Sequence, residues 1–304
     1  MNMIIPIINV LLALLLAPLL PGIINRTKAI FAGRTGQPLL QLYYDIFRLL
    51  RKGAVYSRTT TWIFRAGPIV GLSSAIAAAT LVPFGGSRAL LAFSGDLFLF
   101  AYLFGLGRFF TVIAALDTGS AFEGMGASRE AQFSALAEPV LFLGLVAVAR
   151  ETNSLSLSGM LPAMTPETWI KAGPVLTLAA AAILFVFLTE NSRIPVDDPN
   201  THLELTMIHE VMVLDHGGPD FAFIQYGAAL KLWIFGELLT GILLPLHTGW
   251  PPRDEIIAIA LMAALAVAVG IIESTMARLR LVRIPQILVG AGTLALLSLL
   301  LALR

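Results

Sequence analysis

Carboxylates, an arginine and a histidine gather in one short stretch of a chain that is otherwise mostly apolar. The stretch runs from Thr189 to Glu204 and reads TENSRIPVDDPNTHLE. It follows an apolar segment at about 172–189 and precedes another at about 223–244. A compact charged stretch is often a solvated connector. Acids that continue into both flanks instead favour a site that handles protons or ions.

Acidic residues also occur inside segments that are apolar enough to cross a membrane. They are Glu138, Glu237 and Asp96, and Glu237 lies six residues after Lys231. An acid at the centre of a span costs about 2.5–3.5 kcal/mol on insertion scales, and it usually faces the protein interior or a water-filled path. The alternative is a structural pair between Lys231 and one of these acids. The neighbouring Gly and Ser of Asp96 would also suit a helix break.

The residues after Pro199 predict a helix over 201–215, with a possible capping box from Thr201 to Glu204. At 100° per residue, Glu204 falls in the middle of the apolar face and Glu210 at its edge. His202 and His209 fall on the opposite face. Capping is an ordinary explanation for Glu204, and proton transfer is the functional one. The candidate relay residues are Glu138, Glu190, Asp197, Glu204, Glu210, Glu237, Lys231, His202 and His209.

The histidines and the missing cysteines argue against a metal centre in this chain. His202 and His209 are seven residues apart, whereas a helical zinc site uses two histidines four apart. The sequence contains no cysteine, which excludes Cys-ligated zinc or iron–sulfur sites. We therefore predict no metal and no cofactor bound by this chain.

The elements that carry these residues are predicted to be membrane-spanning helices. The chain has 304 residues, of which 57% are hydrophobic and only 13% charged, against about 25% in soluble domains. We expect an all-α integral membrane protein, a single polytopic domain over 1–304, with no nucleic-acid partner because the net charge is only +1. The first apolar stretch is too long and lacks the basic start of a signal peptide. About eight spans are predicted, at 3–24, 66–83, 89–107, 131–149, 171–189, 223–245, 255–272 and 284–303.

The basic residues predict the orientation. Of the 20 Lys and Arg residues, 14 fall in the first, third, fifth and seventh loops and five on the other side, while Lys231 lies in a span. The positive-inside rule therefore places the odd loops in the cytoplasm and both termini outside, on the periplasmic side of the cytoplasmic (inner) membrane. In this scheme residues 108–130 form a long, glycine-rich third loop.

The first loop contains an amphipathic segment. Residues 39–52 place apolar side chains at helical spacing, with Arg48, Arg51 and Lys52 near the end. We expect a helix on the cytoplasmic surface of the membrane. It could simply cover the bundle, or it could be a docking platform for a soluble partner. The preceding GRTGQP at 33–38 is a turn sequence, without the spacing of a phosphate-binding loop.

The charged stretch resembles a known loop. Glu190, Arg193, Pro195 and Asp197 match the E-(T/S)-N-R-x-P-F-D loop of the heel subunit of respiratory complex I, which carries the quinone chamber. This sequence has Asn-Ser at 191–192 and Val196 where that family has Thr/Ser-Asn and Phe. Glu138, Glu204 and Glu237 are similar to further acids of that subunit, and the layout of spans agrees over nearly the whole chain.

A subgroup of that family matches better. The run from Ile194 to His216 (IPVDDPNTHLELTMIHEVMVLDH) resembles the membrane anchor subunit of group 4 [NiFe]-hydrogenases, of the formate hydrogenlyase and hydrogenase-4 type. The segment GRTGQPLLQ at 33–41 fits the same branch. His202 stands where quinone-reducing relatives often have an acid.

The resemblance implies a non-catalytic subunit that docks a peripheral redox arm and couples its chemistry to proton or sodium movement. The implied partners are a [NiFe]-hydrogenase large subunit, an iron–sulfur small subunit and antiporter-like membrane subunits. The nickel–iron centre and the iron–sulfur clusters would lie in those partners. A quinone-site subunit of NADH:quinone oxidoreductase and a free-standing ion-coupled transporter are the alternatives, although we find no inverted repeat. The implied docking residues are Arg34, Gln41, Asp45, Arg48, Arg51 and Arg193.

Overall fold

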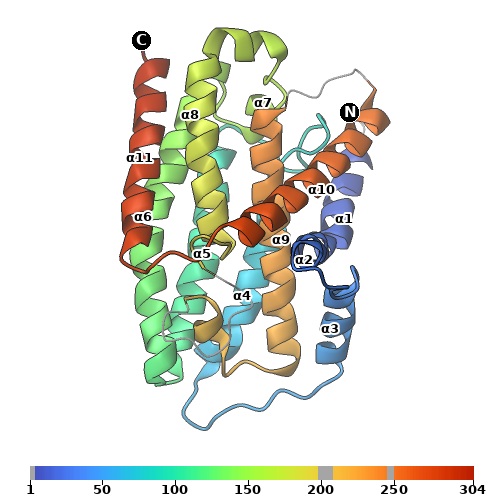
Figure 1. Ribbon diagram of the computed structural model, residues 1–304, viewed down its shortest axis with the longest axis vertical. Coiled ribbons are helices and arrows are strands. Elements are labelled where there is room, and N and C mark those ends of the chain that lie inside the picture. The colour runs from blue at the N-terminus through green and yellow to red at the C-terminus, as the bar shows by residue number, and fades with distance from the viewer. Residues whose placement is uncertain (1–3, 198–207, 245–249) are drawn as a thin grey trace.

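The protein is a bundle of long helices. The computed structural model describes residues 4–197, 208–244 and 250–304, and every regular element in these ranges is helical (Figure 1). In chain order the elements are α1 (Ile4–Leu16), α2 (Leu19–Phe31), α3 (Gln41–Leu50), α4 (Trp62–Ala79), α5 (Asp96–Asp117), α6 (Ala121–Thr152), α7 (Leu157–Met160), α8 (Pro166–Glu190), the 3-10 helix η1 (Glu210–Val213), α9 (Gly218–Leu243), α10 (Pro251–Thr275) and α11 (Arg283–Ala302).

The predicted all-α, multi-pass membrane architecture is confirmed. Among the described residues, seven helices are long and apolar enough to cross a membrane. The helices α1 and α2, which meet at an angle of 43°, pass the same test together and would be the eighth span if the bent pair crosses the membrane as one. Pro18 lies at their junction, and a proline there removes a backbone donor and interrupts helical hydrogen bonding. Both termini lie at the same end of the bundle, here named the outer end, and α3 lies toward the opposite, inner end (Figure 1).

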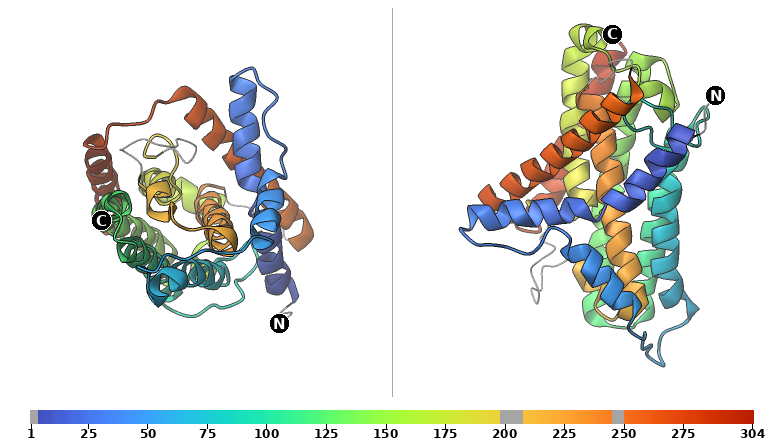
Figure 2. Two further views of the ribbon diagram at one scale, coloured as in Figure 1. Left: turned by 90° about the horizontal axis from the view of Figure 1, so that it is seen from below. Right: turned by 90° about the vertical axis from the view of Figure 1, so that its right-hand side faces the viewer.

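Helices α2 and α10 cross the others at a steep tilt, as the two views of Figure 2 show. Their close approach depends on Gly270 of α10. A Cβ atom there would lie 2.7 Å from the Cβ of Thr27 on α2, so any larger residue would push the helices apart. Small residues serve the same purpose at many helix crossings in membranes.

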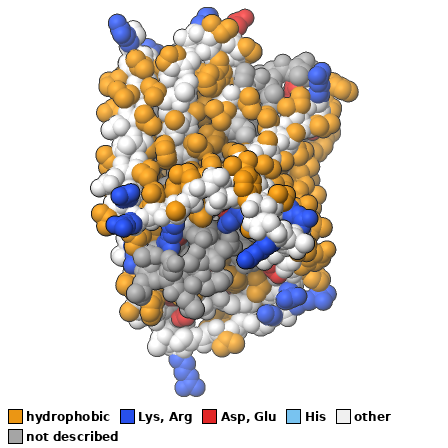
Figure 3. All heavy atoms as spheres, in the orientation of Figure 1, with side chains coloured by type: hydrophobic (Ala, Val, Ile, Leu, Met, Phe, Trp, Pro, Cys, Tyr) orange, Lys and Arg blue, Asp and Glu red, His pale blue; other side chains and the backbone are white. Residues whose placement is uncertain are grey.

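The core fills the space between α4, α5, α8 and α9 with large apolar side chains. Trp233, Phe235, Phe100 and Phe187 are each at most 2% exposed. Figure 3 shows the face of the protein that is turned to the viewer in Figure 1. Its outer part is mostly apolar, and most of its Lys and Arg side chains lie nearer the inner end. This distribution suits a protein surrounded by lipid, and the orientation predicted from the basic residues stays a prediction.

Two predicted spans have different bounds in the structure. Helix α5 begins at Asp96 and ends at Asp117, and α6 begins at Ala121 and runs for 32 residues. The long third loop over 108–130 is therefore wrong, because only three residues separate the helices. Asp96 is also not central in a span. It lies in the first turn of α5, where its carboxylate accepts hydrogen bonds from Ser156 Oγ (2.6 Å) and Leu157 N (2.7 Å).

The predicted helix over 201–215 is only partly described. Residues 198–207, which include His202 and Glu204, lie outside the described ranges. The described part forms a single 3-10 turn, Glu210–Val213, instead of a continuing α-helix. The amphipathic helix of the first loop is present as α3, which packs against α2 and α9 and has no fully buried residue.

Candidate functional site

An arginine in the middle of α5 is the centre of a buried ion-pair network. The Arg108 side chain is only 8% exposed. Its guanidinium donates to the carboxylates of Glu138 and Glu190, and its Nε lies 3.1 Å from Glu130 Oε1. Three acids from α6 and α8 thus converge on one cation. A buried charge is tolerated only when it is paired, so these contacts also explain why Arg108 can lie inside the bundle.

Lys231 of α9 extends the network. Its Nζ lies 2.6 Å from Glu190 Oε2, so Glu190 bridges Arg108 and Lys231. Glu190 is the last residue of α8, and its side chain is 6% exposed. The sequence predicted a possible pair between Lys231 and one of the acids Glu138, Glu237 and Asp96. Instead, the partner is the first acid of the charged stretch.

His209 joins the network from the segment before η1. Its Nε2 lies 3.1 Å from Glu130 Oε2, and its Nδ1 lies 3.4 Å from Asp197 Oδ2. Burial alone would lower the pKa of His209, but the Glu130 and Asp197 carboxylates outweigh burial and raise this pKa to about 10. His209 is therefore an imidazolium at neutral pH. Asp197 in turn lies 2.9 Å from an Arg278 guanidinium nitrogen.

These contacts define the ion-pair network as four carboxylates and four cations. Its members are Glu130, Glu138, Glu190, Asp197, Arg108, His209, Lys231 and Arg278. They come from four long helices, from the loop after α8, from the segment before η1 and from the loop after α10. The titrations of groups that interact this closely are coupled, so their apparent pKa values belong to the set and not to single residues. Proton or ion transfer along these residues stays the prediction made from the sequence.

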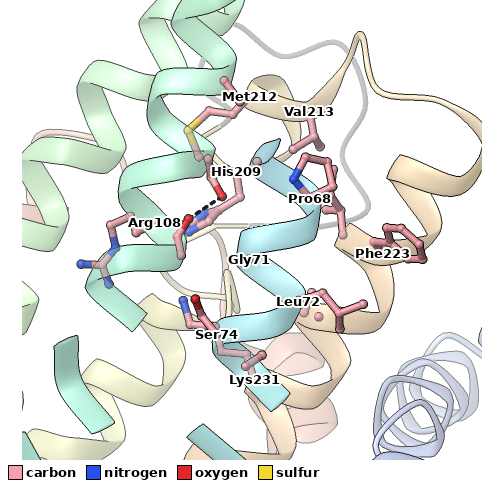
Figure 4. Close-up of a pocket in the computed structure, with 18 of the residues that line it drawn as sticks. Pro68, Gly71, Leu72, Ser74, Arg108, His209, Met212, Val213, Phe223 and Lys231 are labelled. Atoms are coloured by element: carbon pink, nitrogen blue, oxygen red, sulfur yellow. Dashed lines mark hydrogen bonds between the residues drawn. The ribbon is translucent and has the colours of Figure 1, made fainter. Parts of the chain in front are cut away.

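Two adjoining cavities border the ion-pair network. The larger, about 330 Å³, is lined by Glu190, Arg193, Asp197, His209 and Lys231 together with apolar residues of α9. The smaller, about 140 Å³, lies between α4, α5 and α9. Figure 4 shows Arg108, His209 and Lys231 around this smaller cavity. His209 and Lys231 line both cavities, so a molecule or water in either would contact the same charges.

A second, smaller cluster fixes the charged stretch to the tilted helices. Glu273 of α10 lies 2.9 Å from Lys28 Nζ of α2 and 3.4 Å from Arg193 Nη1. The Glu273 side chain is fully buried, and that of Arg193 is 9% exposed. Within this chain the Arg193 side chain is therefore occupied by Glu273, and its predicted role in docking a partner subunit stays a prediction. The arginine links the loop after α8 to α10.

The relay candidates predicted from the sequence lie in different parts of the structure. Glu138, Glu190, Asp197, His209 and Lys231 are in the ion-pair network, and Glu210 lines the larger cavity. Glu237 is buried in the outer half of α9, and no described residue forms an ion pair with it. His202 and Glu204 lie outside the described residues. Within the described ranges, no group of three or more His, Asp or Glu side chains could hold a metal ion.

The other docking candidates lie on or beside α3. Arg34, Arg48 and Arg51 are exposed, whereas Gln41 and Asp45 are half-buried. Gln41 Nε2 donates to Asp45 Oδ1 at 2.9 Å, one helical turn away. This pair stabilises α3 itself. Among these candidates, the arginines are the residues whose side chains are exposed on this chain.

The sequence patterns missed Arg108, Glu130 and Arg278 as site residues. Arg108 was assigned to the start of the third loop, just after the span predicted at 89–107. However, apolar residues continue on both sides of it, from Leu97 to Leu116, and that lone charge in a long apolar run was the available signal. Glu130 lay in the expected loop. Nothing in the spacing of Arg278 identified its partner.

The whole chain has relatives among known proteins. The family described as NADH dehydrogenase matches residues 3–303. Formate hydrogenlyase subunit 4 of Escherichia coli (strain K12) is 33% identical, over 99% of this chain and 100% of that protein. Hydrogenase-4 component C of the same organism is 30% identical, over 90% of this chain and 87% of its own length.

More distant matches share the architecture. A protein of Rubrobacter xylanophilus, by name one of the subunits of NADH-quinone oxidoreductase, is 28% identical over 70% of this chain and 63% of its own. A chain of the membrane-bound sulfane sulfur reductase, an archaeal respiratory membrane complex, superposes with a TM-score of 0.84 at 20% identity. That superposition covers 98% of both chains and shows a shared fold.

Proposed function

Because this chain belongs to the NADH dehydrogenase family, we propose that it is the membrane anchor and coupling subunit of a complex I-like [NiFe]-hydrogenase of the formate hydrogenlyase type. The two relatives that are at least 30% identical are, by name, a formate hydrogenlyase subunit and a hydrogenase-4 component. Relatives that are parts of larger complexes argue against a free-standing transporter. The chain would act within an oxidoreductase complex without performing the redox step itself.

The observation that carries the coupling role is the ion-pair network. Arg108 contacts three carboxylates, and one of them, Glu190, also contacts Lys231. A change of charge at one end of such a set alters the protonation of the others, because their titrations are coupled. Redox chemistry in a partner at the inner end would supply that change. The ion moved would be a proton, or sodium, along the carboxylates toward the antiporter-like subunits.

The cofactors and remaining partners follow from this assignment. The nickel–iron centre and the iron–sulfur clusters would belong to the hydrogenase large subunit and the iron–sulfur small subunit. The sequence of this chain contains no cysteine to ligate a cluster. We place the protein in the cytoplasmic membrane with both termini outside. A reporter enzyme fused after Arg304 should be active only on the outer side of that membrane, and cytoplasmic activity would overturn this orientation.

The docking surface would include the exposed arginines of α3. Arg48 and Arg51 project from a helix whose other face packs on α2 and α9. We predict that Arg48→Gln with Arg51→Gln weakens co-purification of the peripheral subunits, by about 1 kcal/mol per exposed charge, and more so at low salt. The control is Arg150→Gln, an exposed arginine at the outer end of α6. Equal recovery of the complex from all variants would remove α3 from the docking surface.

The larger cavity favours one alternative. Its volume of about 330 Å³ and its apolar lining from α3 and α9 would suit part of a quinone, as in a quinone-site subunit of NADH:quinone oxidoreductase. Co-purification separates the two functions. Purifying the tagged chain from membranes with its partners should yield nickel-containing subunits if the hydrogenase assignment is right. NADH-oxidising partners and bound quinone would support the alternative, and a lone chain would contradict both.

A further inference from the structure

A second acidic site lies apart from the ion-pair network. Glu237 is on α9, six residues beyond Lys231, which corresponds to about 9 Å along the helix axis toward the outer end. The residue is 6% exposed. No described residue forms an ion pair with it. An acid inside a span usually faces the protein interior or a water-filled path.

Two cavities border Glu237 on its outer side. The larger, about 50 Å³, is lined by Gly85 and Gly86 from the connection between α4 and α5, by Thr240, and by Leu244 just beyond the end of α9. The smaller, about 10 Å³, reaches Asn9 of α1 and Arg88. A water molecule needs about 10–15 Å³ of such volume together with polar partners. The two cavities therefore have room for a few waters and for about one, respectively.

Asn9 supplies an independent indication of a polar ligand. This residue is 6% exposed, and its amide nitrogen donates to Phe84 O (3.2 Å) and to Ser87 Oγ. Its Oδ1 accepts no hydrogen bond from any described residue. Asn9 and Glu237 line the same small cavity. Because buried acceptors are nearly always satisfied, a water between the two side chains fits both.

We propose that these two cavities form a water-filled path through which Glu237 exchanges protons with the outer end of the protein. The step is the reversible transfer of one proton from the Glu237 carboxyl group to a cavity water, which leaves a carboxylate and a hydronium ion. Thr240 lies along this path one turn beyond Glu237. The inference deepens the proposed function: the chain would have its own connection to the outer side, in addition to the network at the inner side.

The chain is well suited to an accessibility test because it has no cysteine. Single cysteines would be placed at Leu244, Thr240 and Asn9, which line the path, and at Leu239 as control. Leu239 neighbours Thr240 but is 1% exposed and lines neither cavity. Leu155→Cys, exposed in the loop after α6, identifies the outer end. The probe is Ag⁺, a membrane-impermeant, thiol-reactive cation small enough for cavities that hold single waters, applied to each side of membranes that contain the whole complex. A labelled cysteine is one that no longer takes up a maleimide after the chain is denatured.

The expected result is labelling of L244C and T240C from the side that labels L155C, with L239C unlabelled. Labelling of T240C only from the opposite side, or of neither T240C nor N9C while L155C reacts, would overturn the proposal. N9C carries the test if T240C does not insert. Labelling depends neither on hydrogenase activity nor on the identity of the partners. A wrong assignment of the complex would therefore leave this result unchanged and would appear only in co-purification.

Discussion

Buried carboxylates have different surroundings in the inner and outer halves of the bundle. In the inner half, Glu130 and Glu190 each contact two cations. In the outer half, Glu237 has no ion pair among the described residues and borders cavities instead. Both regions belong to one helix bundle and share helix α9. The difference therefore lies in the partners that tertiary packing supplies.

This contrast separates two uses of an acid in a membrane. A carboxylate held between cations stays ionised, because opposite charges within about 4–6 Å favour the charged form. Removing either partner leaves the other charge buried and unpaired, which destabilises the fold. An unpaired carboxyl beside water is free to gain and lose a proton. The inner network would therefore respond to charge changes as a set, whereas Glu237 would exchange protons individually.

The largest effect is expected where the network has its centre. Arg108→Met leaves the Glu130, Glu138 and Glu190 carboxylates without their shared cation, and we expect a loss of about 3–5 kcal/mol in the free energy of unfolding. Thermal unfolding of the purified protein in detergent measures this loss. Arg150→Met, at an exposed site of α6, is the matched control. Similar melting of the two variants would mean that the network does not stabilise the fold.

A direct comparison of the two halves uses the same substitution in each. Glu190→Gln removes an anion between Arg108 and Lys231 and should cost about 3 kcal/mol. Glu237→Gln preserves shape and breaks no ion pair among the described residues, so its cost should stay within about 1 kcal/mol. The unfolding midpoints of the two variants, each compared with the unmodified protein, measure the two losses of stability. Equal costs would remove the distinction between paired and unpaired acids.

The pH dependence of the free energy of unfolding should show how much the protonated His209 ring stabilises the protein. Its folded pKa of about 10 exceeds the ordinary value of 6.5, so its stabilisation is complete below about pH 6.5 and disappears as the pH rises through 10. One pKa unit corresponds to about 1.4 kcal/mol, and because the ring is 26% exposed we expect about 2 kcal/mol in all. Unfolding midpoints from pH 6 to 10 should fall less steeply in His209→Gln. Parallel curves would show that the imidazolium is not stabilised by its two acids.

The smallest effect on stability is expected at Glu138. Its side chain is 44% exposed, so its pair with Arg108 contributes about 0–1 kcal/mol. Glu138→Gln should leave assembly intact but lower ion translocation per turnover by up to about 100-fold, because glutamine cannot carry the proton. Glu204→Gln should behave in the same way. Ion uptake into vesicles, with the exposed Glu167→Gln as control, tests this. Normal coupling in both variants would exclude them from the relay.

Local sequence patterns were sufficient for the membrane architecture. Continuous apolar runs predicted the spans, and helical spacing of apolar residues predicted α3, because both depend on neighbouring residues alone. The same reasoning failed at residues 108–130. It assumed that charged and glycine residues end a helix, whereas Arg108 and Glu130 stay helical because each has partners on other helices. The sequence of a single segment does not reveal those partners.

The sequence by itself determined the class of protein, the family and most of the acids that matter, including Glu190, Asp197 and Glu237. Only the tertiary structure decided which charges meet. Arg108 pairs with Glu138 and Glu190, which are 30 and 82 positions away, and no periodic pattern relates residues so far apart. Helix packing also separated Glu237 from the network and placed it beside cavities, with no ion pair to any residue that the structure describes. Whether a buried acid is ionised depends on the charges and the solvent around it in space. The chemistry of these acids could therefore be inferred only from the packed structure.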